Sequence, residues 1–119
     1  MSRSILLIDD SKLSRMMIKK ELAPLEVEVY EAGGGQEGID FYKKNRPDVV
    51  FLDLTMPEMD GFETLENLKV IDPDARVIIL TADVQSGSTK RAMELGAIKV
   101  MHKPSKIEDL KAAIEECFE

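Results

Sequence analysis

The sequence has little of several features that mark secreted, membrane and nucleic-acid-binding proteins. It has one cysteine, Cys117, so no disulfide can form within the chain, which fits a reducing compartment. No hydrophobic run approaches the ~18 residues that a membrane-spanning helix requires. The first residues lead into only four apolar positions, 5–8, before two aspartates, so we expect no signal peptide or membrane anchor. These absences predict a cytoplasmic protein.

The charge balance is acidic, and the sequence has no cluster of basic residues. The chain has 119 residues with 16 Lys and Arg against 23 Asp and Glu, a formal net charge of −7. Repulsion from nucleic-acid phosphates opposes non-specific binding, so we do not expect direct DNA binding. A chain of this length can bury one hydrophobic core but not two, and we expect one domain over residues 1–119.

Five short apolar runs alternate with five segments of helical periodicity. The predicted strands are residues 5–8, 27–30, 49–52, 77–80 and 98–101, and the predicted helices are about 11–22, 36–44, 62–70, 88–95 and 106–118. This alternation predicts a parallel sheet with helices on both faces. The fold class is therefore α/β, a doubly wound (βα)5 domain. For its five parallel strands we expect the order 2-1-3-4-5, which is the order known for flavodoxin-like sheets.

Two of these helices have apolar stripes that we expect to be buried. The stripe of the last helix consists of Ile107, Leu110, Ile114 and Phe118, with Cys117 at its border. The stripe of the first helix consists of Leu13, Met16, Met17 and Leu22. Ser105 and Glu108 form an S-x-x-E pattern, which predicts a capping box at the start of the last helix.

Polar residues follow four of the apolar runs. They are Asp9 and Asp10, Asp53, Thr81 and Lys103. The strand order places the acid pair beside Asp53 at the carboxyl edge of the sheet, where open α/β sheets bind ligands. Each residue alone has an ordinary explanation, as a helix cap, a turn residue, a strand end or a solvated charge. Their joint placement favours a functional site.

The three carboxylates of this predicted site need a cation. Clustered carboxylates repel one another, and at least one is protonated unless positive charge is present. One lysine and one divalent ion would neutralise them. Mg²⁺, or Mn²⁺ in its place, suits oxygen ligands from Asp9, Asp10, Asp53 and the backbone carbonyl of Thr55. A carboxylate can also attack a phosphoryl group, a reaction that depends mainly on positioning and charge neutralisation.

Four segments together resemble the receiver domains of bacterial two-component response regulators, of the stand-alone, CheY-like kind. They are residues 8–11 (IDDS), 51–61 (FLDLTMPEMDG), 80–82 (LTA) and 103–104 (KP), and the resemblance spans essentially the whole chain. It implies that Asp53 accepts a phosphoryl group from a sensor histidine kinase or phosphotransfer protein. It also implies that the acid pair holds Mg²⁺ and that Thr81 and Lys103 contact the phosphoryl oxygens.

The same resemblance implies a signalling role and no enzymatic activity beyond the protein's own phosphorylation and dephosphorylation. The output would be phosphorylation-dependent binding of a target protein, with chemotaxis as one candidate pathway, by a monomer or weak dimer. Three positions bear on how that switch works. Val100 stands where the family commonly has Tyr or Phe, so we expect a switch without an aromatic side chain. Thr55 and Asp83 occupy positions that set the phosphoryl lifetime in the family.

Two alternatives stay open. Val100 is compatible with a constitutive receiver-like adaptor that binds partners without being phosphorylated. Residues 33–38 satisfy the dinucleotide pattern G-x-G-x-x-G, with an acidic residue 20 positions after Gly33, which indicates a small nucleotide-binding protein. The nucleotide hypothesis leaves the polar residues at the other strand ends unexplained, and a glycine-rich turn is the plainer interpretation.

Overall fold

The computed structural model describes residues 3–82 and 86–118, in which five strands alternate with five helices. The elements are β1 (Arg3–Ile8), α1 (Lys12–Leu22), β2 (Val27–Ala32), α2 (Gly35–Asn45), β3 (Val49–Leu52), α3 (Gly61–Ile71), β4 (Val77–Thr81), α4 (Ser86–Glu94), β5 (Lys99–His102) and α5 (Ile107–Glu116). The strand order is β2-β1-β3-β4-β5, and every pair is parallel. The predicted fold class and strand order are confirmed.

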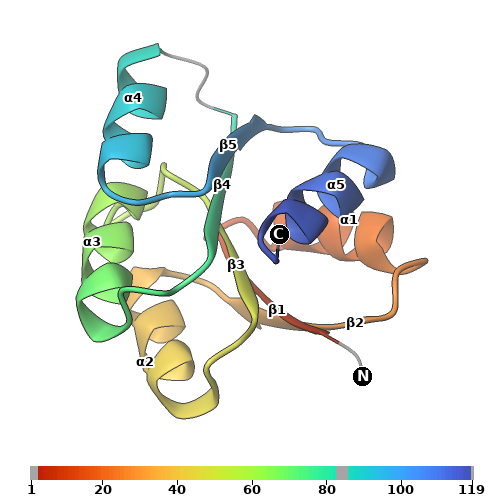
Figure 1. Cartoon of the computed structure of the whole chain (residues 1–119), viewed down its shortest axis with the longest axis horizontal. Helices are drawn as coiled ribbons and strands as arrows, with labels where there is room; N and C mark the ends of the chain where they lie inside the picture. Colours follow the sequence, from red (N-terminus) through yellow and green to blue (C-terminus); the bar gives the residue numbers. More distant parts are fainter. Residues whose placement is uncertain (1–2, 83–85, 119) are drawn as a thin grey trace.

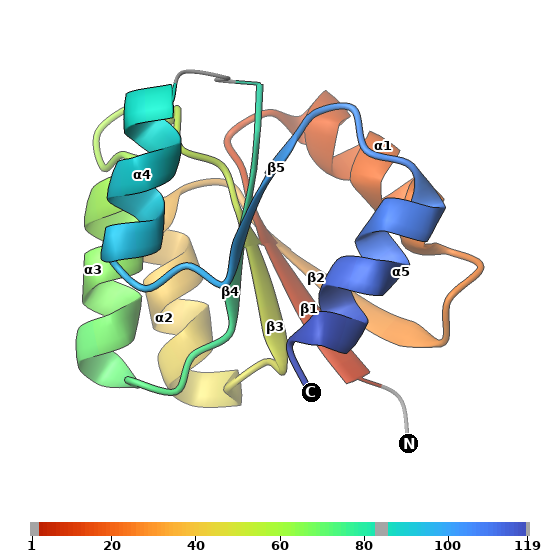
Figure 2. The ribbon, with the colours of Figure 1, turned by 45° about the horizontal axis from the view of Figure 1, so that its top comes forward.

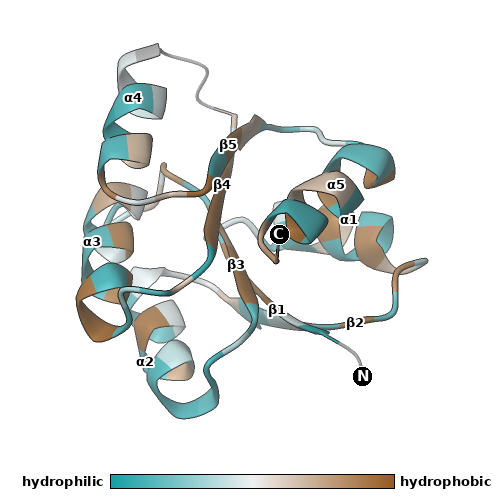
Figure 3. Ribbon diagram, in the orientation of Figure 1, coloured by the Kyte–Doolittle hydropathy of each residue, from teal (hydrophilic) through white to brown (hydrophobic). Residues whose placement is uncertain are grey.

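Helices cover both faces of the sheet. Helices α1 and α5 lie on one face, and α2, α3 and α4 lie on the other (Figures 1 and 2). Successive residues of a strand point to opposite faces, so Leu6 and Ile8 belong to one core cluster while Ile5 and Leu7 belong to the other. The central strands β3 and β4 are hydrophobic along most of their length in Figure 3, as expected for strands covered on both sides.

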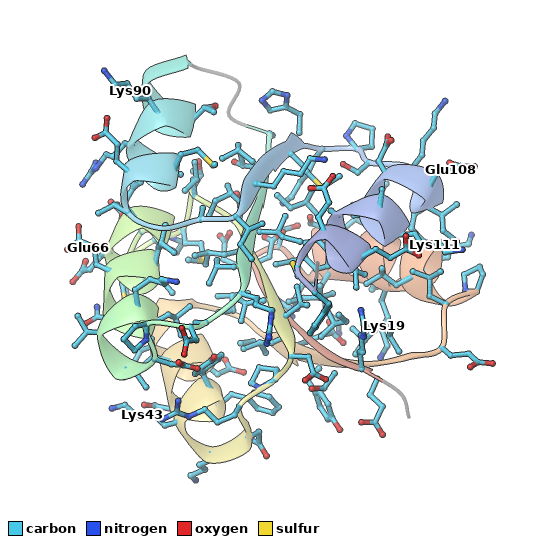
Figure 4. All side chains as sticks on the ribbon, viewed as in Figure 1. Lys19, Lys43, Glu66, Lys90, Glu108 and Lys111 are labelled. Carbon is cyan, nitrogen blue, oxygen red and sulfur yellow. The ribbon has the colours of Figure 1, made fainter. Side chains whose placement is uncertain are left out.

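The outer surfaces of the helices are charged. Lys43 on α2, Glu66 on α3 and Lys90 on α4 point away from the sheet at the rim of the molecule (Figure 4). Across residues 3–82 and 86–118, no helix combines the length and the hydrophobicity needed to cross a membrane.

Helix α1 differs from the sequence prediction. Ile18 and Leu22 are buried, but Leu13, Met16 and Met17 are exposed by 66%, 56% and 55%. The expected wide buried stripe is therefore wrong for three of its four residues. The helix packs on the sheet through the face that carries Ile18 and Leu22, and it leaves a second apolar face in solvent.

Helix α5 also begins differently from the prediction. Its N-cap residue is Lys106, which makes no side-chain capping hydrogen bond. The Ser105 hydroxyl instead donates to the carbonyl of His102 at 2.8 Å, so the predicted capping box does not form. The hydroxyl closes the turn that contains Lys103 and Pro104, which the capping interpretation did not foresee. Leu110 and Ile114 are buried as expected.

The C-terminal end of α5 is attached to the amino edge of the sheet by two arginines. The guanidinium carbon of Arg3 on β1 lies 3.7 Å from the centroid of the Phe118 ring, and that of Arg76, just before β4, lies 4.5 Å from it. Arg76 Nε also donates to the carbonyl of Cys117 at 3.0 Å. Cys117 is half-buried, as expected for a residue at the border of the core.

Candidate metal and phosphoryl site

The strand register brings three aspartates together. Ile8, the last residue of β1, is opposite Leu52 of β3, so the residues that follow them, Asp9 and Asp53, are neighbours. One carboxylate oxygen from each of Asp9, Asp10 and Asp53 lies within 4.8 Å of the others. Asp9 and Asp53 are only 2% and 8% exposed, whereas Asp10 is exposed. The structure thus assembles the predicted acidic cluster at the carboxyl edge of the sheet.

Lys103 reaches into this cluster from the turn after β5. Its ammonium nitrogen lies 2.5 Å from Asp9 Oδ2 and 3.3 Å from Asp53 Oδ2. The Lys103 backbone N–H donates to the carbonyl of Thr81 at 2.8 Å, which ties the turn to the end of β4, and the Lys103–Pro104 peptide bond is cis. The structure therefore brings a single cation between the two buried carboxylates.

Asp9 is held in its ionised form. Burial alone would raise its pKa, but hydrogen bonds from Lys103, the Ser11 N–H at 2.9 Å and the Ser14 hydroxyl outweigh burial and place the pKa below its usual value. Helix α1 is capped by Ser11, whose hydroxyl accepts the Ser14 N–H at 3.1 Å, so neither member of the acid pair is the N-cap residue. Both members remain available to the cluster.

The pKa of Asp53 is shifted in the opposite direction, above its usual value. Burial raises the pKa of Asp53, and the charge on Asp9 adds to this; Lys103, the Thr81 hydroxyl and the Thr55 N–H, at 3.3 Å from Oδ1, oppose the shift without cancelling it. Thr81 is fully buried at the end of β4. The structure thus places both Thr81 and Lys103 against the Asp53 carboxylate.

The backbone beneath Asp53 is packed against the start of α3. Asp60 caps this helix by accepting the Glu63 N–H at 2.9 Å, and the Gly61 N–H donates to the Leu54 carbonyl at 2.9 Å. A Cβ atom on Gly61 would lie 2.3 Å from the carbonyl oxygen of Asp53, which only glycine avoids. Asp60 and Gly61 therefore start α3, and Gly61 also allows the close approach of this helix to Asp53.

Arg15, which sequence reasoning missed, also contacts the site. Its Nη1 donates to the carbonyl of Asp9, and its Nε donates to Glu31 Oε1 at 3.0 Å. Its side chain is only 15% exposed. The available signal was its position five residues after Asp10, in the helix that follows the acid pair. A lone arginine on a helix is ordinarily solvated, so this signal is weak.

The glycine-rich segment is accounted for by packing. A Cβ on Gly35 would meet the Thr64 hydroxyl at 2.3 Å, and one on Gly38 would meet Ile8 Cδ1 at 2.4 Å. The Gly33 N–H donates to Glu37 Oε2 at 3.1 Å, so a carboxylate of the same segment already uses this backbone donor. These contacts support the interpretation of a glycine-rich turn that lets α2 pack closely.

A groove of about 600 Å³ adjoins the site between α1 and the connection from β5 to α5. Its lining is mainly apolar and includes Leu13, Met17, Ile18, Pro104 and Leu110. The exposed face of α1 continues from this groove, so an apolar surface begins next to Lys103. The charged residues Lys20, Glu21 and Lys103 also line the groove.

Val100 and Asp83 are further positions that we expect, from the sequence, to bear on the switch. Val100 is half-buried in β5, opposite Ile79 of β4, and packs against the core cluster under α2, α3 and α4. Strand β5 has no Phe, Tyr or Trp. Asp83 lies outside the described residues.

This arrangement suits a hard divalent cation and a phosphoryl group. Three carboxylates within 4.8 Å of one another are the donor set that Mg²⁺ and Mn²⁺ prefer. The ammonium of Lys103 and the hydroxyl of Thr81 both hydrogen-bond to the Asp53 carboxylate and can donate to phosphoryl oxygens. A carboxylate with these neighbours can serve as a nucleophile toward phosphorus.

Comparisons with known proteins agree with this geometry. The family model for the response regulator receiver domain matches residues 5–115. Sporulation initiation phosphotransferase F of Bacillus subtilis strain 168 is 34% identical over 116 residues, which cover 98% of this chain and 94% of that protein. Chemotaxis protein CheY of the same organism is 38% identical over 117 residues, which cover 98% of each chain.

Solved structures show the same fold. A chain in the crystal structure of the CheX-CheY-BeF3-Mg²⁺ complex from Borrelia burgdorferi superposes with a TM-score of 0.93 at 28% identity, covering 98% of this chain and 90% of that chain. A response regulator receiver domain protein from Clostridium thermocellum superposes with a TM-score of 0.90 at 34% identity, covering 97% and 93% of the two chains.

Proposed function

Because this chain belongs to the response regulator receiver domain family, we propose that it accepts a phosphoryl group on Asp53 and signals through the phosphorylated form. The observation that carries the proposal is the position of Asp53 between the partly buried ammonium of Lys103 and two further carboxylates at the carboxyl edge of the sheet. The donor is a phosphohistidine of a sensor kinase or phosphotransfer protein. The Asp53 oxygen forms the new bond to phosphorus while the phosphorus–nitrogen bond breaks and its electron pair returns to the imidazole.

The divalent ion of the proposal is Mg²⁺, held by Asp10 and Asp53, with Asp9 binding directly or through water and the Thr55 carbonyl completing the protein ligands. The ion supplies positive charge where the phosphoryl oxygens and the carboxylates meet. Burial raises the pKa of Asp53, and the positive charge of a bound ion would lower that pKa and favour the ionised, nucleophilic carboxylate.

Lys103 and Thr81 are the groups of this chain that respond to the new charge. A phosphoryl group replaces one negative charge with about 1.5 to 2, and it adds three acceptor oxygens. Lys103 moves only a short distance, since its ammonium nitrogen already lies 3.3 Å from Asp53 Oδ2. Thr81 donates its hydroxyl from the end of β4, which links the phosphoryl group to the strand that leads toward α4.

The donor protein reaches Asp53 across the exposed face of α1. Leu13, Met16 and Met17 are all more than half exposed and lie on the helix that starts beside the acid pair. Apolar side chains in contact with a groove near the reacting carboxylate suit a helical phosphodonor, whose apolar face they would cover. The output is binding of a target protein at the surface of β5, α5 and the connection from β4 to α4, with Val100 in place of an aromatic switch.

The direct test is labelling by phosphoramidate, a small donor whose phosphorus–nitrogen bond resembles that of phosphohistidine. We expect one phosphoryl group per chain in the presence of Mg²⁺, mapped by mass spectrometry to Asp53, and none in excess chelator. The Asp53→Asn variant should lose the label. Asp60→Asn is the matched control, because it removes a neighbouring carboxylate yet keeps a good N-cap residue for α3, and it should label fully.

Three outcomes would contradict the proposal. The first is full labelling of Asp53→Asn at another residue, and the second is undiminished labelling in excess chelator. The third is a wild-type chain that is never labelled although it binds partners, which supports the constitutive adaptor instead.

A further inference from the structure

The position of Asp10 depends on its backbone. Asp10 is the exposed carboxylate of the acidic cluster, and among residues 3–82 and 86–118 no side chain hydrogen-bonds or pairs with it. Asp9, by contrast, is fixed through its carboxylate by Lys103 and the Ser11 N–H. What orients Asp10 is therefore the peptide plane that joins it to Asp9.

That peptide plane is held by Arg15. Side chains of a helix point back toward its N-terminus, so the guanidinium of Arg15 on α1 reaches the turn that precedes the helix. Its Nη1 donates to the carbonyl of Asp9, which is part of the Asp9–Asp10 peptide. The N–H of Asp9 donates to Ala32 at 3.1 Å, so both backbone groups of Asp9 are bonded.

Glu31 fixes the guanidinium itself. Its Oε1 accepts Arg15 Nε at 3.0 Å, and its Oε2 lies 3.6 Å from the ammonium of Lys19. A guanidinium is a planar fork whose donors keep fixed angles, so one bond to Glu31 orients the bond to the Asp9 carbonyl. The end of β2 therefore sets the orientation of the turn between β1 and α1.

We propose that Arg15 is a positioning residue for the divalent-metal site, which acts by fixing the Asp9–Asp10 peptide plane and with it the Asp10 carboxylate. The inference rests on the proposed function, because it concerns the ion of that same site. It gives Arg15 no contact with the ion or the phosphoryl group.

A charge effect and a positioning effect predict opposite changes in Mg²⁺ affinity when Arg15 is removed. A cation near a metal site repels the metal, so a pure charge effect means that its removal strengthens Mg²⁺ binding. Positioning means that its removal weakens binding, because Asp10 is no longer held in place. Loss of groups that orient metal ligands costs about 10- to 100-fold in affinity, and we expect about 10-fold for Arg15→Ala.

The experiment is a calorimetric titration of the unphosphorylated protein with MgCl2. Arg15→Ala should bind about 10-fold more weakly than wild type. Arg15→Lys keeps the positive charge but not the planar guanidinium, and its Mg²⁺ affinity should lie between those of wild type and Arg15→Ala. Lys19→Ala is the matched control, since it pairs with the same Glu31 but has no contact with the Asp9 carbonyl, and it should bind no more weakly than wild type. In the metal-free protein, amide exchange of Asp10 and Ser11 should be faster in Arg15→Ala, with β1 and β3 unchanged.

Mg²⁺ binding by Arg15→Ala and Arg15→Lys as tight as that of wild type, or tighter, would overturn the inference. Unchanged exchange at Asp10 and Ser11 would also overturn it. If Arg15→Ala does not fold, Arg15→Lys decides alone, because a charge effect predicts no change for it. The titration needs no phosphoryl transfer. Weak Mg²⁺ binding by both variants together with an unlabelled Asp53 would reject the proposed function and leave this inference standing.

Discussion

Substitution of Gly61 tests how closely the start of α3 packs against the backbone of Asp53. In Gly61→Ala the new Cβ would lie 2.3 Å from the Asp53 carbonyl oxygen and 2.5 Å from Leu54 Cα. Non-bonded carbon atoms rest at about 3.5–4.0 Å, so the backbones of α3 and residues 53–54 must separate by roughly 1 Å. The atoms met are backbone atoms, which cannot rotate away as a side chain does.

The expected loss of stability follows from two opposing terms. Overpacking costs up to about 3 kcal/mol, and replacing a helical glycine by alanine returns at most about 1 kcal/mol, which leaves about 2 kcal/mol of destabilisation. A domain of this kind unfolds with a urea dependence of about 2 kcal/mol per molar, so the midpoint should fall by about 1 M.

Equilibrium urea unfolding followed by circular dichroism measures this change. Gly87→Ala is the matched control, because Gly87 lies in α4 and a Cβ there meets no atom within 4 Å. Its midpoint should be unchanged or higher. Labelling of Gly61→Ala by phosphoramidate should also be slower, since the displaced backbone includes Asp53. A Gly61→Ala midpoint equal to that of Gly87→Ala would refute the reasoning.

Two further predictions follow from residues outside the acidic cluster. Met17→Glu should reduce phosphoryl transfer from a histidine kinase that labels the wild-type chain by at least about 10-fold, because a charge would enter the apolar contact, while labelling by phosphoramidate stays unchanged. Val70→Glu on α3, where Val70 is 81% exposed, is the control, and an equal loss in both variants would contradict the assignment of the donor face to α1. Tyr42→Phe should lower the free energy of unfolding at pH 7 by about 1–2 kcal/mol, since it removes a 2.7 Å hydrogen bond to Asp72. Burial and this bond raise the pKa of Tyr42 well above 10, so wild type loses stability as the pH rises beyond about 10, and the difference between the two proteins in urea unfolding should shrink there. A difference that grows with pH would contradict this.

The sheet and the acidic cluster could be predicted because both depend on features that recur along the chain. Unbroken apolar runs such as residues 49–52 belong to strands covered on both faces, and the order of parallel strands places Asp9 beside Asp53 whatever the helices do. The end of its strand places Lys103 at the same edge of the sheet, but only the resemblance implies that it contacts the phosphoryl oxygens. Taken alone, Lys103 cannot be distinguished from a solvated lysine, and only its placement with the other strand-end residues favours a functional role.

The face of α1 could not be predicted in the same way. Leu13, Met16 and Met17 have the three- and four-residue spacing of a buried stripe, and so do Ile18 and Leu22. Periodicity shows that a helix has an apolar face, but the choice between two faces depends on how the helix sits on the sheet. The helix packs through Ile18 and Leu22, and the other face is the one that we assign to the phosphodonor.

The capping box predicted at the start of α5 is wrong for a related reason. Ser105 and Glu108 have the correct residue types for a capping box, but the hydroxyl of Ser105 has a competing acceptor in the carbonyl of His102. The turn around Lys103 and Pro104 brings that acceptor within 2.8 Å. The S-x-x-E pattern therefore does not form a capping box, because the turn that contains Lys103 gives the Ser105 hydroxyl another hydrogen-bond partner.

The contact of Arg3 and Arg76 with Phe118 has a consequence for the order in which the molecule can be completed during synthesis. Arg3 belongs to the strand that is made first, and the ring that it stacks on emerges 115 residues later. Until then β1 has β2 and β3 beside it and α1 on the same face, but the core cluster lacks the side chains that α5 contributes, Leu110, Ala113 and Ile114. Closure of that face is thus a late event, since it requires α5 and the docking of Phe118 against Arg3 and Arg76.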